Sequence, residues 1–248
     1  MKIIFYLILL LFFISCSTTT DYNVCRGYEY YNYGDYDLAT EKFNKAIELN
    51  PSNVEAYNGR GNTHYIQKHY DKALADYSKA LELDPQYYHA YYNCGLVYYN
   101  TGEYYKALVN FHKTIELNPD YGDAYAGRAL VYSKQEKYDK AILDYDKSIE
   151  LSPNNDMTWN NRGYTYLILG QLDKAEKDIK KALKMNKKNQ HANMSMAELL
   201  AIKNENEEAC KWLKKANDYG LDDLSCVKTS AIRHLACFQR MGASNKDR

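Results

Sequence analysis

The residue types that most often carry out chemistry in proteins, histidine and cysteine, each occur six times in this chain. The histidines are His64, His69, His89, His112, His191 and His234. Their spacing follows no ligand or catalytic pattern. The chain also has no Gly-x-Ser-x-Gly sequence, phosphate-binding glycine loop, Cys-x-x-Cys pair or His-Glu-x-x-His sequence. We therefore expect a protein that is not an enzyme, with no catalytic residue, no bound metal and no cofactor.

The cysteines fall into three groups. Cys16 follows an apolar run near the amino terminus. Cys25 and Cys94 lie in segments with helical periodicity, where we expect them to be small core residues. Cys210, Cys226 and Cys237 lie near the carboxyl end, and a disulfide among them is as plausible as three free thiols. Which two of the three would pair stays open.

The amino-terminal segment has the pattern of a secretory signal. Lys2 is followed by an apolar run from Ile3 to Ile14, which is shorter than the roughly 20 residues that a membrane-spanning helix needs. We expect residues 1–15 to be removed as a signal peptide. An ordinary secretory signal would release a soluble product.

The sequence around the cleavage point supports a more specific interpretation. Phe13-Ile14-Ser15-Cys16 resembles the bacterial lipobox, although the family prefers Leu where Phe13 stands. The resemblance implies a lipidated Cys16 and anchoring to a bacterial cell-envelope membrane, on its periplasmic or cell-surface face. Two or more acyl chains hold a protein stably on a bilayer. Residues 16–20 would then be the lipidated cysteine and a short tether.

The composition favours a helical protein and gives no indication of a polyanionic ligand. The chain has 248 residues, with 32 basic and 32 acidic side chains spread along its length, so charge gives no reason to expect nucleic acid as a partner. Only 4 prolines and 12 glycines occur, which favours long helices. The 27 tyrosines, against 6 phenylalanines and 2 tryptophans, suggest a repeated helical surface.

A period of 34 residues runs through the chain. The positions that show it hold alanine, a large apolar residue, proline or a small residue. They are Ala39, Ala73, Ala107, Ala141, Ala175 and Ala209; Phe43, Tyr77, Phe111, Tyr145, Ile179 and Leu213; Pro51, Pro85, Pro119 and Pro153; and Gly27, Gly61, Gly95, Ala129, Gly163 and Ala197. This pattern resembles the tetratricopeptide repeat. The resemblance covers residues 20–223 as six repeats: 20–53, 54–87, 88–121, 122–155, 156–189 and 190–223.

The resemblance implies an all-α fold, a right-handed α-solenoid of helix-turn-helix repeats. Each period begins with one helix, and a second helix follows near positions such as Asp71. Asp37, Asp71, Asp139 and Asp173 are expected just before the start of these second helices, where they would cap the unpaired amide groups. Gly61 and Ala73 are small because paired helices must approach closely there. Residues 224–241 are expected to form a capping helix, and 242–248 a disordered tail.

A second regularity pairs arginine with aspartate sixteen residues later. Arg60 with Asp76, Arg128 with Asp144 and Arg162 with Asp178 share this spacing, whereas Lys42 stands where an aspartate for Arg26 would be. We expect the three pairs to form structural bridges between paired helices or with an adjacent repeat. Unpaired surface charge is the alternative interpretation.

Tetratricopeptide arrays hold extended peptides or partner helices on a concave wall formed by the first helices of the repeats. The resemblance assigns that groove to Val24, Tyr28, Tyr31, Asn58, Asn62, Tyr65, Tyr92, Leu96, Tyr99, Asn100, Ala126, Leu130, Asn160, Tyr164 and Leu167. These residues are aromatic or carry amides, so a cationic clamp for a terminal carboxylate is not expected. Tyrosine and asparagine suit contacts with an extended peptide. Each tyrosine could instead pack only against its neighbours.

Lysine accumulates toward the carboxyl end. Lys177, Lys180, Lys181 and Lys184 line one helical face, and Lys211, Lys214 and Lys215 repeat it one period later. Such a face is either solvated or in contact with an acidic partner or an anionic envelope polymer.

The sequence therefore predicts a non-catalytic adaptor, anchored by lipid in a bacterial envelope, that binds another protein in a groove lined by tyrosine and asparagine. The alternative is a structural envelope component that associates with itself as a homo-oligomer.

Overall fold

The computed structural model describes residues 18–220, and those residues form twelve helices and no strand. The helices are α2 (Thr19–Tyr33), α3 (Tyr36–Leu49), α4 (Val54–Ile66), α5 (Tyr70–Leu83), α6 (Tyr88–Asn100), α7 (Tyr104–Leu117), α8 (Gly122–Lys134), α9 (Tyr138–Leu151), α10 (Asp156–Ile168), α11 (Leu172–Met185), α12 (Gln190–Ile202) and α13 (Asn206–Asp218). The predicted signal peptide, Cys16, the capping helix 224–241 and the tail 242–248 lie outside the described residues.

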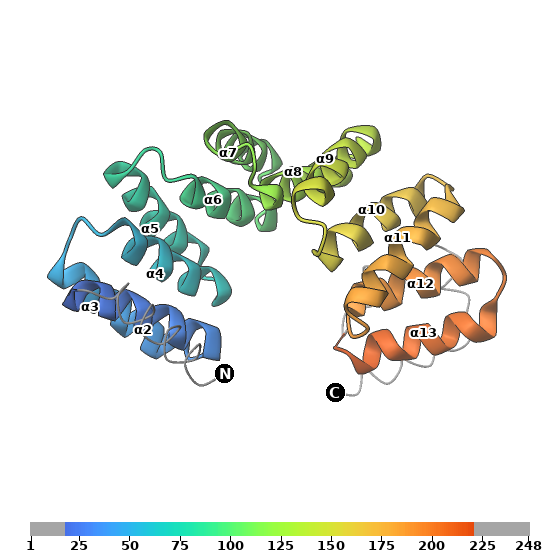
Figure 1. Ribbon diagram of the computed structural model, residues 1–248, viewed down its shortest axis with the longest axis horizontal. Coiled ribbons are helices and arrows are strands. Elements are labelled where there is room, and N and C mark those ends of the chain that lie inside the picture. The colour runs from blue at the N-terminus through green and yellow to red at the C-terminus, as the bar shows by residue number, and fades with distance from the viewer. Residues whose placement is uncertain (1–17, 221–248) are drawn as a thin grey trace, which may run out of the picture. The chain divides into compact units, whose positions relative to one another are not determined.

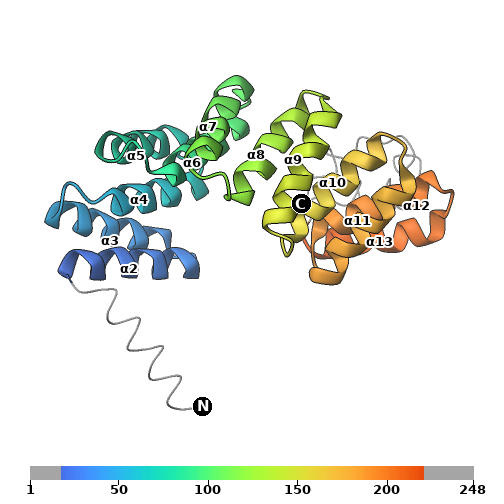
Figure 2. The same cartoon turned by 45° about the horizontal axis from the view of Figure 1, so that its top comes forward.

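Helices pack in consecutive pairs, one pair for each period of 34 residues (Figure 1). The first helix of each pair is α2, α4, α6, α8, α10 or α12, and the second helix follows after a tight turn. The expected all-α fold of stacked helix pairs is therefore confirmed. The chain divides into unit 1, up to Pro119, and unit 2, from Asp120, with three pairs in each (Figure 2).

The periodic positions form the core. All six alanines of the period are fully buried, and the six large apolar residues four positions later are at most 1% exposed. A Cβ on Gly61 would lie 2.6 Å from a ring carbon of Tyr77, so a larger residue there would displace the aromatic ring. The small residue and the aromatic residue are thus two sides of one helix–helix contact.

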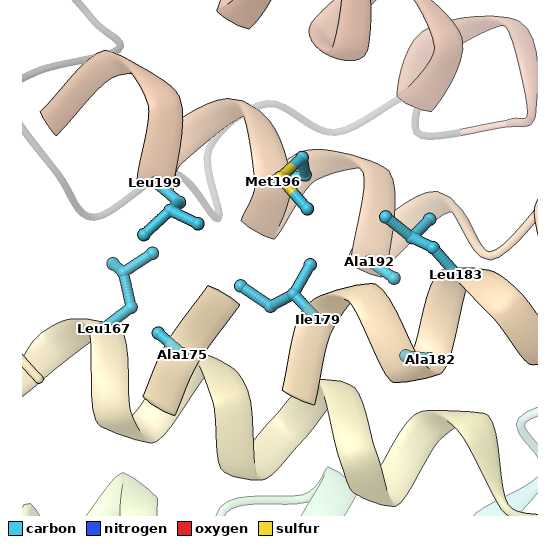
Figure 3. Close-up of a cluster of buried hydrophobic side chains, with 8 residues drawn as sticks. All are labelled: Leu167, Ala175, Ile179, Ala182, Leu183, Ala192, Met196 and Leu199. Atoms are coloured by element: carbon cyan, nitrogen blue, oxygen red, sulfur yellow. The ribbon is translucent and has the colours of Figure 1, made fainter. Parts of the chain in front are cut away.

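Unit 2 contains a core cluster that joins three helices. Leu167 of α10, Ile179 and Leu183 of α11, and Met196 and Leu199 of α12 are buried together with neighbouring alanines (Figure 3). Because α11 buries one side in this cluster, its opposite side is left for charged residues.

The helix ends differ from the expectation in one respect. The second helices begin at Tyr36, Tyr70, Tyr138 and Leu172, so Asp71 and its equivalents lie inside the first turn and are not the capping residues. A carboxylate in the first turn still meets the positive end of the helix dipole. Side-chain caps are found mainly on the first helices, for example Asn53 accepting from the backbone amide of Ala56 at 2.7 Å.

Three of the residues expected in the tether, 18–20, belong to the start of the first helix. Helix α2 begins at Thr19, and the Thr18 side chain accepts a hydrogen bond from the backbone amide of Asp21 at 3.1 Å. Asp21 returns a bond to the Thr18 amide, which completes a capping box. Residues 18–20 are therefore the start of the first helix pair.

Between residues 18 and 220, no helix is both long enough and apolar enough to cross a membrane.

Candidate partner-binding face

In unit 1 the helices α2, α4 and α6 are neighbours and form one surface, named here the first-helix face (Figures 1 and 2). Tyr28 and Tyr31 come from α2, Asn58, Asn62 and Tyr65 from α4, and Tyr92 and Tyr99 from α6. Asn58 is buried and the other six are half-buried. The structure thus brings the predicted groove residues of unit 1 onto adjacent helices and leaves part of each tyrosine accessible.

The asparagines of this face belong to an internal hydrogen-bond network. Asn93 Nδ2 donates to Asn58 Oδ1 at 2.8 Å and to Asn62 Oδ1 at 2.9 Å. Asn62 Oδ1 also accepts from the Tyr77 hydroxyl at 2.9 Å. These amide oxygens are therefore occupied and link α4 to α6 and to α5. Sequence reasoning missed Asn93, because the corresponding positions in the other repeats do not hold a constant residue type.

Three of the tyrosines pack against a second tyrosine five residues later. The ring centroids of Tyr31 and Tyr36 are 5.9 Å apart, and the equivalent pairs in the next two repeats, Tyr65–Tyr70 and Tyr99–Tyr104, are at 6.0 and 6.1 Å. The partner tyrosine opens the second helix of the same repeat. Sequence reasoning missed these contacts, although the 34-residue spacing of Tyr36, Tyr70 and Tyr104 was a signal that could have revealed them.

The hydroxyl groups on this face remain protonated at neutral pH. Burial raises the pKa of Tyr31, Tyr65 and Tyr99. Burial also raises the pKa of Tyr28, against a smaller opposing effect of its hydrogen bond with Asn58. Tyr65 accepts a bond from Asn100 Nδ2 at 2.7 Å and keeps its own proton to donate. The face therefore presents apolar ring surface with neutral hydroxyl donors.

In unit 2 the predicted groove residues are more enclosed. Tyr164 is half-buried on α10, while Asn160 is only 3% exposed and its Oδ1 has no hydrogen-bond partner among the described residues. Leu167, also expected on this face, is buried in the core, as is Val24 in unit 1. Of the tyrosines predicted for the groove, all but Tyr164 therefore lie in unit 1.

All three expected arginine–aspartate bridges are formed, and each is bidentate. Arg60 donates from Nε and Nη2 to Asp76 at 2.9 and 2.6 Å, and Arg128 makes the same two bonds to Asp144 at 2.7 Å each. Arg162 bonds Asp178 at 2.7 and 2.9 Å. The bridges join the two helices of a repeat, and the aspartates are at most 7% exposed.

Two of these arginines also reach the preceding repeat. Arg60 Nη1 donates to Asn44 Oδ1 at 2.7 Å, and Arg162 Nη1 donates to Asp146 Oδ1 at 2.6 Å. Arg26, which lacks an aspartate sixteen residues later, bonds instead to Glu29 and to the Tyr30 hydroxyl on its own helix. The bridges are therefore links between helices, and two of the three also join successive repeats.

The cysteines follow the expectation only in part. Cys94 is a buried free thiol, as predicted for a core residue. Cys25, also expected to be a small core residue, is half-buried and disulfide-bonded. Cys210 is disulfide-bonded as well. Cys226 and Cys237 lie outside the described residues, and the pairing among the three stays a prediction. Within residues 18–220, no three His, Cys, Asp or Glu side chains are placed to hold a metal ion.

Comparison with family models identifies the repeats. Two models described as "TPR repeat" and "Tetratricopeptide repeat" match residues 27–68, 61–102, 88–121 and 122–155, and a further tetratricopeptide repeat model matches residues 144–177. Together these matches extend from residue 27 to residue 177. No curated protein sequence matches the chain significantly.

Solved structures give the same result. The chain is 31% identical to MamA, with a TM-score of 0.55, covering 65% of this chain and 95% of MamA. It is 29% identical to YrrB, described as a TPR protein with an unusual peptide-binding site, with a TM-score of 0.54, covering 75% of this chain and 95% of YrrB. Cut9 in its complex with Hcn1 shares the fold at a TM-score of 0.78 and 17% identity, covering 90% of this chain and 42% of that one.

Proposed function

Because the chain belongs to the tetratricopeptide repeat family, whose members bind peptides or partner proteins, we propose that it is a non-catalytic adaptor. The first-helix face of unit 1 would hold an extended segment or a helix of another protein. Lipid on Cys16 would anchor the adaptor in a bacterial cell envelope, on the periplasmic or cell-surface side of the membrane.

The observation that carries the proposal is the chemistry of the first-helix face. Half-buried tyrosines from α2, α4 and α6, the first helices of three successive repeats, expose apolar rings and neutral hydroxyl donors. The hydrogen bonds of Asn93 to Asn58 and Asn62 link α4 to α6. Tyrosines that are already partly packed lose little side-chain entropy when a ligand covers them. YrrB, a family member of similar identity, is described as having a peptide-binding site.

The partner assignment is tested by affinity capture from solubilised membranes with changes at Tyr65, Tyr92 and Tyr99. Replacing all three by alanine removes both rings and hydroxyls, and replacing them by phenylalanine keeps the packing and removes only the hydroxyls. Tyr105→Ala is the control, because this side chain is 79% exposed and lies on α7, the second helix of its repeat.

Loss of a distinct partner protein with the alanine variant, but not with the control, supports the adaptor. Loss of self-association instead would support the alternative of a homo-oligomeric structural component. The anchor has its own test, incorporation of radioactive palmitate into the natural chain and into Cys16→Ala. Equal labelling of the two forms would contradict lipidation at Cys16.

A further inference from the structure

The outer side of unit 2 carries lysines that lack the partners found in other repeats. In four successive repeats, a lysine of the second helix pairs with a glutamate three residues later. The pairs are Lys45–Glu48 at 2.9 Å and Lys79–Glu82, Lys113–Glu116 and Lys147–Glu150 at 2.8 Å each. In the fifth repeat the lysine is Lys181, and Lys184 stands where the glutamate would be. A neutralised pair is thus replaced by two adjacent positive charges.

The change extends beyond this one position. Lys177, Lys181 and Lys184 on α11, with Lys187 and Lys188 in the following turn, are named here the lysine face, and all five are exposed. From residue 179 to residue 204 the chain has six lysines and a single acidic residue, Glu198, which is only 1% exposed. No carboxylate at the surface of this stretch is available to neutralise the lysine face.

Glu176 and Asp178, the two acidic residues of α11 nearest this stretch, are already engaged. Glu176 accepts from Lys180 and from Lys203, and Asp178 is held by Arg162. Lys181 lies 5.8 Å from the Trp159 ring centroid, a contact that orients the ammonium group but leaves its charge in place. The helix dipole favours a cation in the last turn of α11, which accounts for Lys184 but not for Lys177 or the turn lysines.

The fold fixes this face toward the outside. Ala175, Ile179, Ala182 and Leu183 turn the other side of α11 into the cluster shared with α10 and α12 (Figure 3). Lysines at i, i+4 and i+7 lie together on the side that remains. The side chains are long, and among the described residues no hydrogen bond or ion pair holds any of the five ammonium groups in place. Such mobile cations suit a diffuse layer of negative charge better than a single ligand of defined shape.

We propose that the lysine face of unit 2 contacts the anionic phospholipid headgroups of a membrane. The positive charge of the face follows from the structure. The choice of a membrane as the partner rests on the proposed anchoring through Cys16. Juxtamembrane lysines are attracted to anionic lipid over about a Debye length, and each contributes additively. Such a contact would hold unit 2 at the membrane surface independently of the lipid on Cys16.

The test uses a form of the chain that begins at Ser17, which keeps every described residue and lacks the proposed anchor. Its partitioning is measured by co-sedimentation with vesicles of mixed phosphatidylglycerol and phosphatidylcholine, and with vesicles of phosphatidylcholine alone. The test variant carries Lys177→Gln, Lys181→Gln and Lys184→Gln. The control carries Lys79→Gln, Lys113→Gln and Lys147→Gln, which removes the same net charge from lysines that are paired with glutamate.

We expect binding to the anionic vesicles only, weakened by added salt. Each neutralised lysine of the face should lower the partition coefficient about fivefold, so about a hundredfold for the test variant, with a much smaller effect in the control. Equal losses in the two variants would show that only overall charge matters and would overturn the proposal. Binding to soluble polyphosphate without binding to the anionic vesicles would overturn it too. Because this form lacks Cys16, neither result depends on lipidation.

Discussion

Arg162 of α10 and Asp178 of α11 form a bidentate ion pair, in which Nε donates to Oδ2 at 2.7 Å and Nη2 donates to Oδ1 at 2.9 Å. The third guanidinium nitrogen, Nη1, reaches Asp146 of the preceding repeat at 2.6 Å. One side chain therefore links two helices of its own repeat to the second helix of the repeat before it. The Asp178 carboxylate is 2% exposed and depends on this arginine for neutralisation.

Replacing Arg162 with methionine should leave the Asp178 carboxylate buried without its counter-ion. We expect the free energy of unfolding to fall by about 2 to 4 kcal/mol. Urea unfolding followed by circular dichroism measures the change. Arg26→Met is the matched control, since Arg26 bonds only within its own helix and should cause a much smaller change. Equal effects at the two sites would contradict a special role for the bidentate bridge.

The turn inside each repeat contains one residue in the left-handed region of the backbone. Gly34, Gly102 and Gly170 occupy this position with φ between 71° and 82°, and Lys68, Glu136 and Asn204 occupy it with φ between 59° and 63°. A side chain costs free energy in this conformation, and glycine does not. Glu136→Gly should therefore raise the free energy of unfolding by about 0.5 to 1 kcal/mol, as measured by urea denaturation. The reciprocal change, Gly102→Glu, should lower it, and a stabilising Gly102→Glu would refute this explanation.

Acidification should weaken the fold through two half-buried histidines, His64 and His89. Burial lowers the pKa of His64, against the opposing carboxylate of Asp76 at 3.9 Å and with the positive groups of Arg60, Lys72 and His69 adding to the effect. Burial also lowers the pKa of His89, against a smaller opposing effect of Glu55. The unfolded chain then binds protons more readily than the folded chain, so stability is full above the ordinary histidine pKa and is lost as the pH falls through it.

His64 offers a direct way to test this pH dependence, because tyrosine fills the same repeat position at Tyr30, Tyr98, Tyr132 and Tyr166. His64→Tyr should keep the packing and reduce the loss of stability between about pH 7 and about pH 5. The loss due to His89 should remain. The test is the urea midpoint of unfolding of both proteins, measured across that pH range. An equal decrease of the midpoint with falling pH in the two proteins would contradict a contribution from His64.

The Cys94 thiol should be protected in the native protein. Burial raises its pKa to about 12, so the reactive thiolate is scarce at neutral pH, and the sulfur lies in the core of unit 1. We expect a maleimide to modify Cys94 only after urea unfolding, as located by mass spectrometry of the peptide that contains it. Rapid modification in the folded protein would show that α6 is less firmly packed than the structure indicates.

The periodic residues led to the fold through the family that they resemble. Ala73, Tyr77 and Gly61 recur at one interval because the same helix–helix contact is made in each repeat, so their spacing indicated the tetratricopeptide repeat, and that resemblance implied the helix pairs. The Arg–Asp bridges could be predicted for the same reason, since Arg162 and Asp178 keep a constant separation in the chain and on the paired helices.

Features that depend on neighbouring repeats were harder to predict. The hydrogen bonds of Asn93 to Asn58 and Asn62 cross from one helix pair to the next and involve positions that vary between repeats. Asp71 was assigned to a cap, but the chain enters the helix one residue before it, since its neighbour Tyr70 already belongs to α5. The disulfide at Cys25 gave no signal in the spacing, because its helical surroundings resemble those of Cys94.

The first-helix face can be tested directly by placing the photo-crosslinking residue benzoylphenylalanine at Tyr92 and, in a separate variant, at Tyr105. Both tyrosines belong to the same repeat, and Tyr105 is 79% exposed on α7, on the second helix of the pair. Irradiation in intact cells should link position 92, but not position 105, to a different polypeptide. Crosslinks to a partner from position 105 alone, or from neither position, would contradict binding of a partner protein by the first-helix face.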